Sequence, residues 1–258
     1  MAVVLFGAAA VSVVVLALIL VFLFREGLPL LSRVPVAGVL FGRDWLPTSV
    51  PPRFGVIPLV AGTAWVTAGA LVLSVPAGLG VAIYVAEVAP PRARELLKPL
   101  LELLAAVPSV VFGFVGVFLL APLVKAVFGL PSGLTLLTGS VVLAVMALPT
   151  IVTLSEDALR SVPESFREAS LALGASRWET VVHVTVPAAR SGLLAAVMLG
   201  MGRVVGETMA VLMVTGNAPR IPGSPLESGR TLTATIASEM GEAVRLSDHY
   251  HALFILGI

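Results

Sequence analysis

The apolar residues of this chain are gathered into blocks about as long as a membrane is thick. Five blocks cover residues 2–24, 56–88, 100–122, 136–155 and 188–214, and a sixth begins near Tyr250. A helix needs roughly 20 apolar residues to cross the hydrocarbon core of a bilayer, and these blocks lack the alternation that a membrane-spanning strand requires. We therefore expect an all-α membrane protein with about six transmembrane helices, the last of them truncated at the end of the sequence.

The charge pattern excludes several other classes of protein. Charged residues make up 12% of the chain and hydrophobic residues 58%, and the basic residues behind the net charge of +1 are scattered, so no nucleic-acid partner is expected. Cysteine is absent and histidine occurs three times, so we expect neither a metal site nor a cofactor. No linker or internal repeat stands out, which favours a single membrane domain over residues 1–258 that is embedded in lipid.

A polar segment separates the fourth block from the fifth. Residues 156–187 are too polar for the lipid core, yet Leu159, Phe166, Ala169, Leu173 and Trp178 recur at helical spacing. This pattern predicts short amphipathic helices at the membrane surface. Gly174 divides the segment in two.

The same segment resembles the cytoplasmic loop of membrane subunits of ATP-binding-cassette importers. Their signature is Glu-Ala-Ala, three residues, Gly, nine residues, Ile, one residue, Leu-Pro. This chain has Glu168-Ala169-Ser170, three residues, Gly174, nine residues, Val184, one residue and Val186-Pro187. The spacing matches throughout, and the departures at Ser170, Val184 and Val186 are conservative in size.

The resemblance implies the type I ABC importer permease fold, with residues 156–187 as a cytoplasmic coupling loop. It assigns contact with the ATPase subunits to four residues of the signature: Glu168, Ala169, Gly174 and Pro187. A signature in the cytosol also implies that the amino terminus is cytoplasmic.

Other stretches resemble one branch of this family, the C-type permease subunits of Pst phosphate importers. They are "FGVIPLVAGT" (54–63), "AIYVAEVAP" (82–90), "LKPLLELLAAVPSVVFGFVG" (97–116), "GMGRVVGETMAV" (200–211) and "TLTATIASEMGEA" (231–243). This resemblance implies a multi-pass protein of the bacterial plasma (inner) membrane that forms half of a phosphate pathway. The implied partners are a homologous A-type permease, two ATP-binding-cassette ATPase subunits, and a periplasmic or extracellular phosphate-binding protein, for which Trp45 and Arg220 are candidate exposed contacts.

Arg203 and Glu207 place two charges inside the fifth apolar block. A charge near the bilayer centre costs about 2.5–3.5 kcal/mol on insertion scales, so it requires a partner or a function. On a continuous helix the two side chains would share one face and could form a structural ion pair. Alternatively, Arg203 offers a planar fork of donors to passing phosphate, with Glu207 holding it in the empty state and Thr208 adding a hydroxyl. Both interpretations stay open.

Three further residues or pairs carry weaker predictions. Gly202 and Gly206 form a Gly-x-x-x-Gly pattern that favours close packing against another span or the partner subunit. Pro108 is expected to kink the third span. Glu87, near the end of the second block, is expected to extend toward the cytoplasmic face.

No enzymatic activity is expected of this chain, because it lacks the Gly-rich Lys-Ser/Thr loop that holds ATP. The rival interpretations are a permease for sulfate or molybdate, an intramembrane enzyme, and an ion channel.

Overall fold

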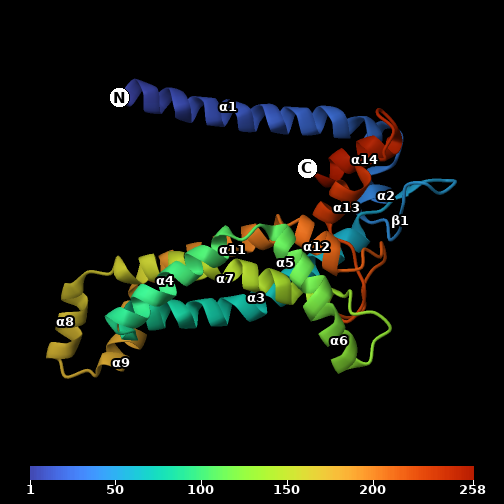
Figure 1. Ribbon diagram of the computed structural model, residues 1–258. Coiled ribbons are helices and arrows are strands. Elements are labelled where there is room, and N and C mark those ends of the chain that lie inside the picture. The colour runs from blue at the N-terminus through green and yellow to red at the C-terminus, as the bar shows by residue number, and fades with distance from the viewer. The chain divides into compact units, whose positions relative to one another are not determined.

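The computed structural model describes the backbone of residues 1–258 and all side chains except those of residues 2–4 and 8. Its regular secondary structure is helical apart from one short pair of strands, and turns and loops connect these elements (Figure 1). Its contacts group into two compact units, Met1–Thr63 with Gly216–Ile258, and Ala64–Thr215. The single domain expected over residues 1–258 stays a prediction, and each unit is described by itself.

The first unit combines the two ends of the chain. In order it holds α1 (Ala2–Gly27), the 3-10 helix η1 (Leu28–Ser32), α2 (Val36–Leu40), β1 (Trp45–Leu46), β2 (Arg53–Phe54), the start of α3 (Ile57–Ile83), α13 (Leu232–Glu239) and α14 (Asp248–Leu256). The strands are antiparallel, with Trp45 opposite Phe54. Their side chains join Leu30, Leu59 and Leu253 in one buried core.

One carboxylate ties this unit together. Glu239 Oε2 accepts hydrogen bonds from Trp45 Nε1 at 3.0 Å and faces His249 Nε2 at 2.9 Å, while Arg230 pairs with Oε1. Trp45 is therefore buried, with 1% of its surface exposed. The expectation that Trp45 is an exposed contact was wrong, because its indole N–H donates inward to the partly buried Glu239 and its ring packs on Phe54. Arg220 is exposed as expected.

The second unit holds the remaining elements. They are the rest of α3, the π-helix η2 (Tyr84–Val88), α4 (Pro91–Ala106), α5 (Ser109–Val115), the π-helix η3 (Gly116–Leu120), α6 (Ala121–Phe128), α7 (Leu136–Arg160), α8 (Glu164–Ala172), α9 (Arg177–Thr180), the π-helix η4 (Val181–Thr185), α10 (Val186–Ala188), α11 (Arg190–Val205) and α12 (Met209–Val214). Within this unit α8 and α9 lie at one end and α6 at the other (Figure 1).

Helix α7 is the centre of the second unit. Its buried residues join those of α3, α11 and α12 in an apolar core that includes Val66, Leu143, Ile151, Val204 and Val211. Small residues let α11 approach α7 closely. A Cβ on Gly200 would lie 2.5 Å from Ile151 Cγ1, and one on Gly192 would lie 2.5 Å from Ala158 Cβ. This close approach is the arrangement in which small residues join helices in membranes.

The helical class and the membrane spans agree broadly with the sequence prediction. By length and composition, four helices of the described chain could cross a membrane: Leu5–Ser32, Ile57–Val88, Ser109–Phe128 and Leu136–Arg160. A fifth span results if Arg177–Ala188 and Arg190–Val205, which meet at 69°, are counted as one broken span. The sixth block forms α14, which has nine residues.

Two expected spans have different bounds. The third was expected over residues 100–122, but α4 ends at Ala106 and a new helix begins at Ser109. Val107 and Pro108 are extended between them, with ψ values of 127° and 140°, because a proline disfavours the helical conformation of the residue before it. The fifth, expected to run unbroken from 188 to 214, is interrupted after Val205.

Candidate functional site

The break between α11 and α12 falls inside the charged stretch of the fifth apolar block. The helix ends at Val205, and α12 begins at Met209. The Glu207 carboxylate accepts a hydrogen bond from the backbone N–H of Ala210 at 3.1 Å, and the Thr208 hydroxyl donates to the Gly206 carbonyl at 3.2 Å. Both side chains therefore satisfy backbone groups that a helix break leaves without intrahelical partners.

Arg203 lies in the last turn of α11 and is exposed. Helix α11 ends at Val205, between the two residues, and the structural pair of Arg203 and Glu207 stays a prediction. The positive guanidinium sits at the carboxyl end of a helix, where the macrodipole favours a cation. Its donors are available to a ligand.

The two glycines of the Gly-x-x-x-Gly pattern do not pack against another helix of the described chain. A Cβ on Gly202 would meet nothing within 4 Å, and one on Gly206 would meet the carbonyl of Gly202. Gly192 and Gly200, which approach Ala158 and Ile151 of α7, lie instead on the side of α11 that also holds the buried Ala196. Packing of Gly202 and Gly206 against a partner subunit stays a prediction.

The second candidate site is the segment between α7 and α11. Gly174 ends α8 in a left-handed conformation with φ +88°, which separates α8 from α9 as the sequence indicated. A capping box opens α9: the Ser176 hydroxyl accepts from the Glu179 N–H at 3.3 Å, and the Glu179 carboxylate accepts from the Ser176 N–H at 2.7 Å. The hydrogen bond from the Ser176 backbone N–H to the carboxylate lowers the pKa of Glu179. The hydroxyls of Ser170 and Thr180, 2.9 Å apart, join α8 to α9.

The outer face of this segment is open. Glu168, Ala169, Gly174 and Pro187 are all exposed, and Leu173 exposes 90% of its surface. A groove of about 380 Å³ lies among them, and its lining is almost wholly apolar: Phe166, Ala169, Ser170, Leu173, Ala175 and Val184. Exposed apolar surface of this kind marks an interaction site. The structure thus gathers residues from both halves of the signature around one groove.

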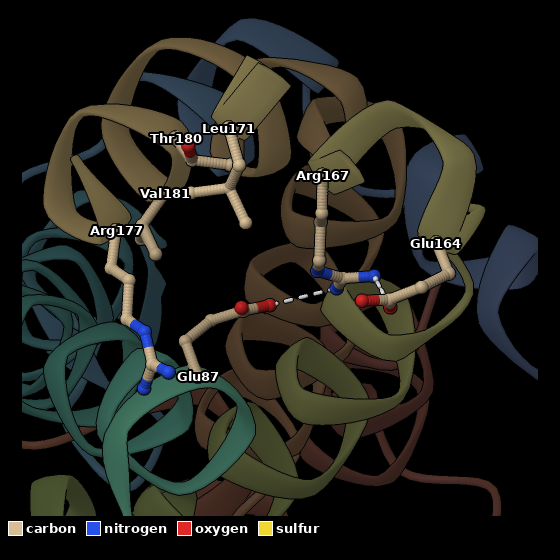
Figure 2. A pocket seen from close by; sticks show the side chains of 7 residues that line it. All are labelled: Glu87, Glu164, Arg167, Leu171, Arg177, Thr180 and Val181. Carbon is tan, nitrogen blue, oxygen red and sulfur yellow. Dashed lines mark hydrogen bonds and ion pairs between the residues drawn. The ribbon is translucent and has the colours of Figure 1, made fainter. Parts of the chain in front are cut away.

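The inner face carries an ion pair that the sequence analysis missed. Arg167 of α8 donates to Glu87 Oε1 of η2 at 2.8 Å (Figure 2). Their side chains expose 15% and 10% of their surfaces. Glu87 does not extend into solvent as expected, because this guanidinium lies within its reach. The hydrogen bond raises the pKa of Arg167, against the effect of burial. No sequence signal pairs these two residues, which are 80 positions apart.

A second buried carboxylate lies nearby at the end of α7. Glu156 exposes 2% of its side chain, and its Oε1 lies 2.7 Å from Arg160 NH2 and 3.3 Å from Lys98 Nζ on α4. A buried carboxylate requires such partners. The pairs link the basic connector after the second span to α7.

Comparison with known proteins agrees with this architecture. Residues 74–243 match the family described as binding-protein-dependent transport system inner membrane component. The chain is 41% identical over 242 residues to the probable ABC transporter permease protein YqgH of Bacillus subtilis, covering 93% of this chain and 78% of that one. It is 37% identical to the phosphate transport system permease protein PstC of Mesorhizobium japonicum, covering 80% of this chain and 68% of that protein.

A solved structure shares the fold. The chain superimposes on one from the inward-facing MetNI methionine ABC transporter with a TM-score of 0.56 and 23% identity, over 78% of this chain and 85% of the other. The likeness supports the expected permease fold and carries no information on substrate.

Proposed function

The chain belongs to the family of binding-protein-dependent transport system inner membrane components, and we propose that it is the C-type permease subunit of an ATP-driven phosphate importer. Membership makes it a multi-pass transport subunit of the membrane rather than an enzyme. The observation that carries the assignment of phosphate is the similarity, at 37% identity over most of the chain, to a permease named for phosphate transport.

The exposed guanidinium of Arg203 is consistent with an anionic substrate. It is exposed and stands in an apolar segment, in the last helical turn before a break between two helices. Interruptions of this kind are typical of transporter helices that line a substrate site. We assign Arg203 to the phosphate pathway, with Glu207 and Thr208 holding the shape of the break beside it.

The groove on α8 and α9 is the proposed attachment site of an ATPase subunit. Its apolar lining and the exposed Glu168 offer both surface and charge to a partner. Four candidate spans precede this segment, so an amino terminus in the cytoplasm places the groove in the cytoplasm with the ATPases. A homologous A-type permease would complete the pathway, and a phosphate-binding protein outside the membrane would deliver the substrate.

Reconstitution of the whole assembly in liposomes tests this function. Radiolabelled phosphate, sulfate and molybdate are offered separately, with and without ATP and the ATPase subunits. We expect ATP-dependent uptake of phosphate that unlabelled sulfate and molybdate do not suppress. Preferential uptake of another oxyanion would reassign the substrate, and flux in the absence of the ATPase subunits would indicate a channel.

A further inference from the structure

The helix that carries the signature is held to the membrane helices by one arginine side chain. The Arg167 guanidinium donates to the Leu159 carbonyl at 3.0 Å and to the Val162 carbonyl at 2.9 Å, at the end of α7 and just after it. It also reaches Glu87 Oε1 at 2.8 Å and Glu164 Oε2 at 3.2 Å. A guanidinium has five donors in a rigid fork, so one side chain can fix several acceptors in one geometry.

Of the four contacts that Arg167 makes, the ion pair with Glu87 is the one that connects α8 to a helix distant in sequence. The chain itself connects α8 to α7 through Ser161–Pro163, and to α11 through α9 and α10. Glu87 lies 80 residues away in sequence, at the end of the long helix formed by α3 and η2. The polypeptide therefore connects α8 covalently to α7 and α11, and Arg167 adds a non-covalent connection to α3.

The end of η2 is itself held firmly. Arg94 of α4 donates to the Val85 carbonyl at 3.1 and 2.9 Å and to the Ala86 carbonyl at 3.1 Å, which satisfies acceptors left free where the helix ends. Arg167 and Arg94 thus both form hydrogen bonds to the same helix end. A displacement of α8 that preserves these contacts must move the end of η2 with it.

We propose that Glu87 and Arg167, hereafter the Glu87–Arg167 clasp, transmit movement of α8 to α3, so that α3 follows the ATPase-driven motion together with α7. The proposal rests on the proposed function, since it requires an ATPase that moves α8. Both residues are positioning residues: neither lines the groove on the outer face of α8 and α9. They border instead a separate cavity of about 240 Å³ on the inner face, with Leu171, Arg177, Thr180 and Val181 (Figure 2).

The chain offers a matched control for this pair. Glu87→Gln removes the charge of a carboxylate that is 10% exposed, whereas Glu164→Gln removes the charge of a carboxylate that contacts the same guanidinium but is 73% exposed. Exposed ion pairs contribute little. Arg167→Lys supplies a milder variant that keeps the positive charge and loses the fork.

Distances between spin labels on α8 and α3 test the Glu87–Arg167 clasp directly. Because cysteine is absent, labels can be placed by Ser165→Cys on α8 and Val72→Cys on α3, both exposed positions, in the purified assembly with and without ATP. We expect a narrow distribution of label separations in both states, broadened by Glu87→Gln, broadened less by Arg167→Lys, and unchanged by Glu164→Gln. A distribution equally narrow in all variants overturns the proposal.

Coupling is measured on the same variants. Glu87→Gln is expected to retain ATP hydrolysis while the anions carried per ATP fall roughly three- to thirtyfold, the usual range for residues that couple two sites. An unchanged ratio also overturns the proposal, even if the label distances broaden. The ratio is taken with whichever anion the assembly carries, and the label distances need no anion. Failure of the phosphate assignment is therefore distinct from failure of the clasp.

Discussion

The close packing of α11 on α7 gives a sharp prediction, because two glycines of α11 that are two positions apart in sequence have different surroundings. Alanine at Gly200 places its Cβ 2.5 Å from Ile151 Cγ1, whereas alanine at Gly202 meets nothing within 4 Å. Both substitutions gain the same helix propensity, about 0.8–1.0 kcal/mol. Overpacking adds a cost of about 1–3 kcal/mol at Gly200 alone.

The difference between the two variants isolates this contact. Gly202→Ala should raise the thermal midpoint of the purified chain in detergent or leave it unchanged, and Gly200→Ala should unfold at a lower temperature than Gly202→Ala. The gap is expected to be about 2–4 °C for each kcal/mol in a chain of this size. Combining Gly200→Ala with Ile151→Ala should cost less than the sum of the two. Equal midpoints for the two alanine variants would refute the packing of α11 against α7 described above.

Three other predictions follow from local geometry. The lowered pKa of Glu179 means that the capping box stabilises α9 above the ordinary glutamate pKa of 4.5 and loses this effect as the pH falls through the lower folded value. Hydrogen-exchange protection of α9 should fall on acidification, and Glu179→Gln, which removes the titrating carboxylate, should abolish that dependence. Gly174→Ala should destabilise the chain by about 1–2 kcal/mol because φ is positive, and Gly174→Asn by less, as thermal unfolding would show; equal losses contradict the assignment. Trp45→Phe should cost about 1.5–3 kcal/mol through the lost hydrogen bond to Glu239, and an unchanged midpoint would argue against that bond.

Much of the architecture could be predicted because it depends on periodicity and length. The apolar blocks at 56–88 and 136–155 became α3 with η2 and α7, since lipid leaves helix as the available conformer. Gly174 separated α8 from α9 as expected, because a left-handed residue ends a helix wherever it occurs. These outcomes follow from the local chain and need no knowledge of distant contacts.

The helix bounds were predicted less well where residues that interrupt a helix lie inside a long apolar block. Pro108 was expected to kink the block from 100 to 122, and the structure instead has a complete break there. The block from 188 to 214 gave no indication of the break after Val205. Hydropathy averaged over a whole block registers neither break, because the many apolar residues around Pro108 and around residues 206–208 dominate the mean.

The Glu87–Arg167 clasp was missed for a different reason. Its members are 80 residues apart, and no pattern in a single sequence connects them. The position of Glu87 near the end of an apolar block suggested that its side chain extends toward solvent. Arg167 becomes the partner of Glu87 only because the fold brings α8 within reach of η2.

The central claim is that Arg203 meets the transported anion, and ATP-driven phosphate uptake by the whole assembly tests it most directly. Arg203→Ala should reduce uptake at least tenfold, since a hydrogen bond to a charged group contributes about 1.5–3 kcal/mol. Arg203→Lys should retain part of it, and Arg190→Ala, which removes an exposed positive charge from the same helix, should leave it near the unmodified rate. Uptake by Arg203→Ala equal to that of Arg190→Ala, in assemblies with the same ATPase activity, would contradict the account.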